Sequence, residues 1–214
     1  MREVFREAAM AEFTINDGDA AGERYFHRTD CPRRPGAGVQ WLRFALRADG
    51  FFRHSPASHF AIALRARLGF DAAGRPCSIS GRGITLGDTS QAVAPADNLH
   101  ARVGGFGGAR GAQVESFWPG GNFLYRQARL LDAGFVDGLT YRVELTVDDQ
   151  REVGFCLDAE TAGGRWRRIG AARVRDRAAH PVEPADGLLI ALGRGGGETG
   201  PWSVRFSDIQ WGWR

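Results

Sequence analysis

The side chains of this sequence whose types and spacing could do chemistry are histidines, tyrosines, arginines and carboxylates. His54 and His59 flank a Ser-Pro-Ala-Ser segment, while Tyr125-Arg126 and Arg142-Val-Glu144 lie in stretches with strand character. A histidine or tyrosine can abstract a proton while an arginine neutralises a carboxylate on the substrate. If these groups met on one sheet face, they would suit an elimination reaction. Histidines in loops are more often simply polar, so catalysis is only an alternative interpretation.

The carboxylates do not form a convincing hydrolytic pair. Glycoside hydrolysis uses two facing carboxylates about 5 to 10 Å apart. Glu144 and Asp148 share one face of one expected strand, and extended geometry separates them by about 13 Å, too far for a retaining pair. Glu144 paired with Glu115 across strands stays open. A solvated polar face explains these acids equally well.

Six tryptophans give a clearer indication than the acids do. Sugar rings expose C–H faces that pack on indole and phenol rings, while polar side chains hold the hydroxyls. Trp41 lies on the polar side of its expected strand, Trp118 adjoins a Pro-Gly-Gly turn, and Trp166 precedes two arginines. Each is a candidate ligand platform, although large rings also fill sandwich cores. Trp211 and Trp213 are expected to pack or to cover an edge.

Nothing in the sequence requires a cofactor, and a metal site is left open. Three cysteines far apart, without a Cys-x-x-Cys motif, argue against a disulfide framework or a zinc site, and Cys156 is expected to be buried in a strand. Asn16-Asp-Gly-Asp19 and Asp208 offer oxygen ligands for calcium, but an ordinary Asx turn accounts for the first group. Nucleophile-elbow, zinc-protease and phosphate-loop motifs are absent from the sequence.

The composition is that of a globular protein with a mild positive charge. Of its 214 residues, 43% are hydrophobic and 25% charged, and the net charge is +3. All 28 basic residues are arginines, which grip carboxylates in a bidentate way. They are spread along the chain, so nucleic-acid binding is not favoured. The sequence shows neither an apolar run long enough for a membrane span nor a signal-peptide core. We expect a cytoplasmic protein, or one exported without a cleaved signal, and no membrane contact.

The elements that must position these groups are β-strands. Apolar and polar side chains alternate at 39–47, 59–67 and 140–148. With Val153, Phe155 and Leu157 after the turn at 148–151, the third stretch predicts a hairpin over 140–157. Further strands are expected at Gly83–Leu86, Ala112–Phe117, Asn122–Leu131, Trp166–Val174, Gly187–Leu192 and Trp202–Trp213. Glycines punctuate the chain between them.

This pattern predicts an all-β fold. Helical signals are few: one or two turns over Arg2–Met10. We therefore expect one domain, 1–214, with residues 1–12 as a short helical or loose segment. Ten to twelve strands would form an antiparallel two-sheet sandwich or jelly roll.

Three stretches together resemble the concanavalin A-like lectin/glucanase superfamily. They are His59–Arg67 with Gly81–Gly87, Gly138–Val147 with EVGFCLD, and the ending Gly200–Trp211. The resemblance implies two curved antiparallel sheets, with glycans often bound on the concave face or in rim loops. The sequence departs from the enzymes of this superfamily in two ways. The Glu-x-Asp-x-x-Glu strand of laminarinase-like hydrolases is absent. Of the three strand motifs of alginate-lyase-like enzymes (Arg-x-Glu, Gln-x-His and Tyr-Phe-Lys), only the first has a counterpart here, at Tyr141–Glu144.

These observations favour a non-catalytic, lectin-like carbohydrate-binding module with a concave-face groove. The arginines favour an acidic glycan. Alternatives are a polysaccharide lyase or glycoside hydrolase on the same groove, and a structural module of a phage-like or secreted assembly with a protein partner or a second copy of itself. Ligand identity and oligomeric state stay open. The expected ligand-binding residues are Arg43, His59, Trp118, Tyr125, Arg126, Arg142 and Glu144.

Overall fold

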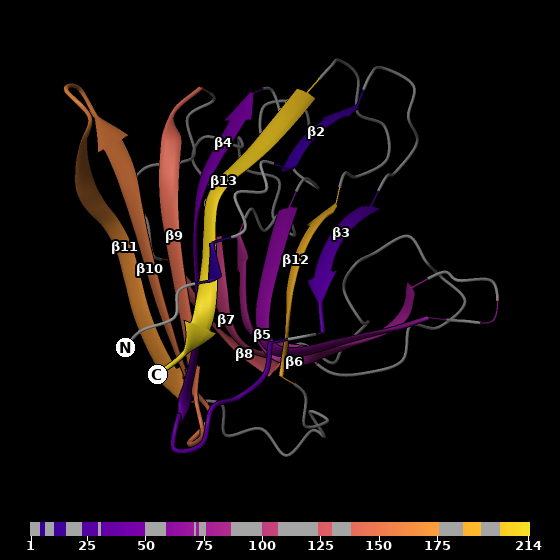
Figure 1. Cartoon of the computed structure of the whole chain (residues 1–214). Coiled ribbons are helices and arrows are strands. Elements are labelled where there is room, and N and C mark those ends of the chain that lie inside the picture. Colours follow the sequence, from indigo (N-terminus) through magenta and orange to yellow (C-terminus); the bar gives the residue numbers. More distant parts are fainter. Residues whose placement is uncertain are drawn as a thin grey trace.

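The computed structural model describes residues 5–6, 11–15, 23–29, 31–49, 59–70, 72, 76–86, 100–106, 124–129, 138–175, 186–193 and 202–214. Within these residues there are 13 strands and no helix (Figure 1). The strand predicted at 112–117 lies outside the described residues. So do His54, Glu115, Trp118, Asp19 and the turn at 119–122.

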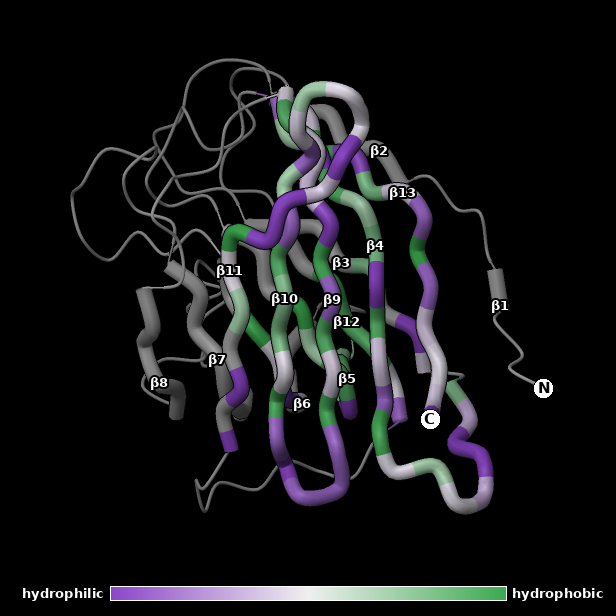
Figure 2. The backbone as a smooth tube through the Cα atoms, turned by 90° about the vertical axis from the view of Figure 1, so that its left-hand side faces the viewer, coloured by the Kyte–Doolittle hydropathy of each residue, from purple (hydrophilic) through white to green (hydrophobic). Residues whose placement is uncertain are grey.

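The strands form two antiparallel sheets that lie face to face (Figures 1 and 2). Sheet A has the order β1-β13-β4-β9-β10-β11, with β2 also paired to β13. Its strands are β1 (Phe5–Arg6), β2 (Ala11–Ile15), β4 (Val39–Asp49), β9 (Thr140–Asp148), β10 (Glu152–Thr161), β11 (Arg165–Arg175) and β13 (Trp202–Trp213). Sheet B has the order β3-β12-β5-β6-β7-β8. Its strands are β3 (Glu23–Arg28), β5 (His59–Phe70), β6 (Pro76–Leu86), β7 (His100–Phe106), β8 (Leu124–Arg129) and β12 (Gly187–Gly193).

Alternate side chains of both sheets meet in one hydrophobic core. Leu42 and Phe44 of β4, Leu145 of β9, and Ile62 and Leu64 of β5 all belong to this core and are almost completely buried. Their polar neighbours point away from it, so apolar and polar residues alternate along the sheet A strands in Figure 2. Each fully buried side chain of this kind contributes about 1.5–3 kcal/mol. The period of two thus decides which face of each strand turns inward.

A bulge interrupts β13 between Ser207 and Gln210, where the register with β4 shifts. Asp208, in this bulge, has a φ of 53°, in the left-handed region that aspartate enters more readily than most residues. Phe206 before the bulge and Ile209 after it are both buried in the core. The bulge therefore lets residues of opposite parity face the same side of one strand.

A buried glutamine ties the two sheets together. The Gln40 side chain of β4 is 1% exposed, and its Nε2 donates to the Asp186 carbonyl oxygen at 2.6 Å. Its Oε1 accepts a hydrogen bond from the backbone N–H of Arg65 at 2.7 Å. Arg65 is in β5 and Asp186 precedes β12, so one side chain joins sheet A to two segments of sheet B.

The jelly-roll sandwich and most of the predicted strands are confirmed. The hairpin over 140–157 corresponds to β9 and β10, and the last strand, 202–213, has the predicted bounds. The helix expected over Arg2–Met10 is wrong at Phe5–Arg6, which pair with β13 as a strand. The described residues hold 13 strands, more than the ten to twelve expected. The single domain stays a prediction.

The expected burial of Cys156 is wrong. Its neighbours Phe155 and Leu157 fill the core, so the alternation turns Cys156 to the outward face of sheet A, where it is partly exposed. Asp158, on the same outward face, is by contrast only 6% exposed. The reason lies in its partners, described next.

Candidate functional site

The predicted ligand-binding residues divide between the two sheets. Arg43 lies in β4, and Arg142 and Glu144 in β9, on the outward face of sheet A. His59 lies in β5, and Tyr125-Arg126 in β8, both in sheet B. β8 and β9 belong to opposite layers, so the structure does not bring all of these residues together on one sheet face. The residues of the alternative enzyme site, His59 or Tyr125 with Arg142 and Glu144, are divided between the two layers in the same way.

A hollow of about 310 Å³ opens on the outward face of sheet A. Gly154 of β10 and Ala171 of the neighbouring β11 are among its lining residues, and neither has a long side chain that could fill it. The residues that line the hollow are Glu144, Thr146, Gly154, Phe155, Cys156, Ala171, Arg173 and Arg214. Only Glu144 among them was predicted to bind ligand.

One wall of the hollow carries an ion pair across β4 and β9. Arg43 and Glu144 are directly opposite in register, and Arg43 Nη2 lies 3.1 Å from Glu144 Oε2. Both side chains are partly exposed, at 46% and 31%, so the pair is open to solvent and to ligands. An exposed pair of this kind contributes little to stability, about 0–1 kcal/mol. The structure brings these two predicted residues together as expected.

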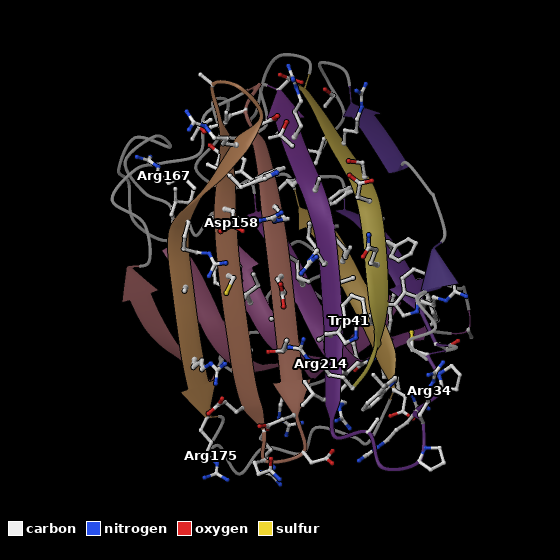
Figure 3. All side chains as sticks on the ribbon, turned by 60° about the vertical axis from the view of Figure 1, so that its left-hand side comes forward. Arg34, Trp41, Asp158, Arg167, Arg175 and Arg214 are labelled. Carbon is white, nitrogen blue, oxygen red and sulfur yellow. The ribbon has the colours of Figure 1, made fainter. Side chains whose placement is uncertain are left out.

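Beside the hollow, Asp158 holds two arginines. Arg142 Nε and Nη2 donate to Asp158 Oδ2 at 3.2 and 2.9 Å, and Arg168 Nε donates to Oδ1. Burial alone would raise the pKa of Asp158, but the hydrogen bonds from Arg168 and Arg142 outweigh it and lower the pKa below its ordinary value. Asp158 is thus a charged anchor that fixes two guanidinium groups on this face. Figure 3 labels Asp158 on the outward face of sheet A.

The anchored arginines reach an aromatic ring and a thiol. The Arg142 guanidinium lies 4.7 Å from the centroid of the Trp166 ring, a cation–π distance. Arg168 Nη1 donates to Cys156 Sγ at 3.1 Å. Trp166 remains 38% exposed, which confirms that it is available on the surface. Trp41 is partly buried on the same face, and Figure 3 shows it on β4 near Arg214.

A second charged cluster closes one end of the sandwich. Asp149, in the turn after β9, accepts from Arg33 Nη2 at 2.6 Å and from Arg65 Nη2 at 3.0 Å. The hydrogen bond from Arg33 lowers the pKa of Asp149. Trp213 lies against both guanidinium groups, with Arg33 5.4 Å and Arg65 4.2 Å from its ring centroid. These contacts fix the end of β13, in agreement with the packing role expected for Trp213.

The two acids at and beside the hollow are both paired with arginines. Glu144 is paired with Arg43, and Asp158 is held by Arg142 and Arg168, so both acids already have cationic partners. Among the described residues, no group of three or more histidine, cysteine or acidic side chains could hold a metal ion. In the same part of the chain, no helix is long and apolar enough to cross a membrane.

Sequence reasoning missed Asp158, Arg168, Arg173 and Cys156. The sequence held a signal for Cys156 and Asp158. Because Phe155 and the alternate apolar residues of β10 point inward, the residues between them must point outward. The local sequence pattern could not predict that β10 pairs with β11, and this pairing brings Arg168 to Asp158.

No protein-family model and no curated protein matches this sequence at a significant level. A solved legume lectin-like domain from Entamoeba histolytica is similar over 99% of this chain and 96% of its own, with 12% identity and a TM-score of 0.52. The fold is the concanavalin A-like jelly roll.

Other solved jelly rolls are similar at lower scores. The exoplasmic/lumenal domain of VIP36, in a form bound to Ca²⁺ and Man3GlcNAc, matches over 96% of this chain and 90% of its own, with 11% identity and a TM-score of 0.49. Alginate lyase AlyC3 in complex with dimannuronate matches over 96% and 74%, with 11% identity and a TM-score of 0.48. Identities this low do not assign a function to this chain.

Proposed function

We propose that this protein is a non-catalytic, lectin-like carbohydrate-binding module that holds an acidic sugar residue in the hollow on sheet A. The observation that carries the proposal is the hollow itself, about 310 Å³ in volume and lined by both charged and small side chains. That volume lies at the lower end of the range of small-molecule sites, about 300–1,000 Å³. It therefore suits a ligand of one or two sugar rings.

The lining offers the groups that a sugar acid needs. The Glu144 carboxylate can accept hydrogen bonds from sugar hydroxyls, and the Thr146 hydroxyl can donate or accept. Arg173, whose side chain is 82% exposed, and Arg214 lie at the same hollow and can grip a sugar carboxylate. Ala171 supplies an apolar floor for a C–H face of the ring.

The paired acids favour binding over hydrolysis. A glycosidase needs one carboxyl group that is protonated and a second that is free to attack or to activate water. The lowered pKa of Asp158 works against protonation, and its two arginines occupy both of its oxygens. Glu144 is likewise engaged by Arg43. This supports a module that recognises its ligand without cleaving it.

Calorimetric titration with uronate disaccharides and with neutral disaccharides tests the proposal. Ala171→Trp would fill the hollow and should weaken uronate binding by about tenfold or more, about 1.4 kcal/mol. Ala72→Trp, at an exposed turn position after β5, is the matched control and should bind as the wild type does. Absence of binding by the wild type to all of these sugars, or equal binding by Ala171→Trp, would overturn the proposal. Release of unsaturated or shortened products would refute its non-catalytic part.

A further inference from the structure

Strand β11 is unusually rich in arginine. Its sequence, RWRRIGAARVR, places five arginines in 11 residues, and all five are exposed. The strand pairs only with β10 in the described sheet, so it forms an edge of sheet A. Figure 3 shows Arg167 and Arg175 near opposite ends of this edge.

Most of this charge is not neutralised by nearby acids. Within the described residues, the side chains of Arg165 and Arg167 make no hydrogen bond or ion pair. Arg175 donates from Nε to the backbone oxygen of Gln150 at 3.2 Å, which leaves its charge uncompensated. Arg173 has only a long contact of 3.4 Å with Glu152, at the surface. Four of the five guanidinium groups are therefore available to an anionic ligand, and two of them, Arg173 and Arg175, lie on the outward face of sheet A.

An exposed tryptophan shares the outward face of β11 with Arg173 and Arg175. Arg165 and Arg167 lie on the opposite face of the strand. The β10–β11 turn contains Gly163 and Gly164, whose φ values of 84° and 70° are ones that glycine adopts without strain. Arg165 and Trp166 follow this tight turn directly, as the first residues of β11. Trp166 is 38% exposed, with Arg142 4.7 Å from its ring centroid. The ring is thus held in place while part of it faces solvent.

Protection of an edge strand explains only part of this pattern. Charged side chains on an edge strand discourage pairing with other chains, and that accounts for arginines at the edge. It does not account for an exposed indole in the same strand, since a large apolar ring on an edge favours association. A cation-rich edge with one fixed aromatic platform instead fits a ligand that carries both anions and apolar ring faces.

We propose that β11 is a binding track for an extended acidic polysaccharide, a uronate polymer, running from the β10–β11 turn past the hollow; this inference rests on the proposed function. From Arg165 to Arg175 the strand extends over about 33 Å, longer than a disaccharide. Sugar carboxylates pair with Arg173 and Arg175, which share the outward face of sheet A with Trp166 and the hollow. Trp166 packs on a ring near the turn, and the hollow beside Ala171 and Arg173 receives one unit.

The acids on the neighbouring strand favour a polysaccharide over a nucleic acid. Glu152 and Glu160 of β10 pair in register with residues of β11, so negative charge lies beside the track. Nucleic acids carry densely spaced phosphates and are held mainly by neutralising them. A polymer with one carboxylate on each sugar unit, separated by neutral ring faces, is repelled less by these two glutamates.

The test compares polymer and dimer binding in matched variants of the full chain. Trp166→Ala/Arg175→Gln removes the aromatic platform and one charge from the track and leaves the residues that line the hollow unchanged. Arg165→Gln/Arg167→Gln changes two exposed arginines on the opposite face of the same strand and is the matched control. The probes are a uronate polymer, a uronate disaccharide, a neutral polymer and single-stranded DNA, each titrated at several salt concentrations. Circular dichroism and thermal unfolding of every variant check that it is folded.

We expect the track variant to bind the uronate polymer at least about tenfold more weakly, with a shallower salt dependence. It should bind the disaccharide as the wild type does, and the control variant should match the wild type for all probes. If the track variant keeps full polymer affinity while the disaccharide still binds, the track is refuted and the hollow stands. If no uronate binds any variant, the proposed function fails. DNA binding that is tighter than polymer binding and lost in the track variant would assign the track to nucleic acid and overturn the inference.

Discussion

Replacing Asp158 by asparagine should destabilise the protein at neutral pH by about 2 kcal/mol. The side chain is 9% exposed and accepts hydrogen bonds from two guanidinium groups, each bond to a charged group contributing about 1.5–3 kcal/mol. Arg142 and Arg168 are 37% and 53% exposed, so water can solvate them once the carboxylate is gone, and the loss stays below the 3–5 kcal/mol of a fully buried pair. For a domain of this size, about 2 kcal/mol lowers Tm by about 4–8 °C.

Urea unfolding of wild type and Asp158→Asn across pH measures this contribution directly. The pKa of Asp158 in the folded protein is lowered from 3.8, so the carboxylate stabilises the fold above that value. The stabilisation is lost as the pH falls through the folded pKa, where the two proteins should converge. Glu160→Gln, an isosteric neutralisation on the same strand at a residue without a described partner, is the control and should change little. Equal midpoints at pH 7, or a difference that persists undiminished in acid, would refute the reasoning.

Two further predictions concern the joint between the sheets and the floor of the hollow. Gln40→Leu should cost about 2–4 kcal/mol in chemical denaturation, because the N–H of Arg65 and a carbonyl oxygen lose their buried partner; an unchanged midpoint would contradict the role of this glutamine. In a Cys77→Ser background, a thiol reagent should modify the partly exposed Cys156 in the folded protein and the 2% exposed Cys31 only after unfolding. A bound uronate disaccharide should slow the modification of Cys156, and lack of protection would place the ligand elsewhere.

The strands were predictable because their information is local. Alternation at Leu42 and Phe44, and again at Val143 and Leu145, follows from the pleat of a half-buried strand, and the structure turns each of these residues inward. The resemblance of the final strand to jelly-roll proteins likewise depends on neighbouring residues only. Fold class could therefore be read from the sequence.

The candidate site was only partly predictable, because it depends on which strands become neighbours. Arg43 and Glu144, both predicted to bind ligand, do lie together. Arg142 was grouped with residues of sheet B, since nothing local tells one layer of a sandwich from the other. The importance of Asp158 depends on a register shift between β10 and β11 at Leu157. A periodic pattern of apolar residues does not reveal such a register shift. The sequence could not predict the hollow beside it for the same reason.

The bulge in β13 has a consequence for how this chain is compared with its relatives. Before Ser207 the core positions of the strand are even-numbered, such as Phe206, and after it they are odd-numbered, such as Ile209 and Trp211. An alignment with a jelly roll that lacks the bulge must open a one-residue gap here, or half of the strand is matched to solvent-facing positions. By the same logic, deletion of Asp208 should make the strand regular. Ile209 would then follow Ser207 directly and stand opposite Phe44, and both halves of the strand would still turn their apolar residues inward.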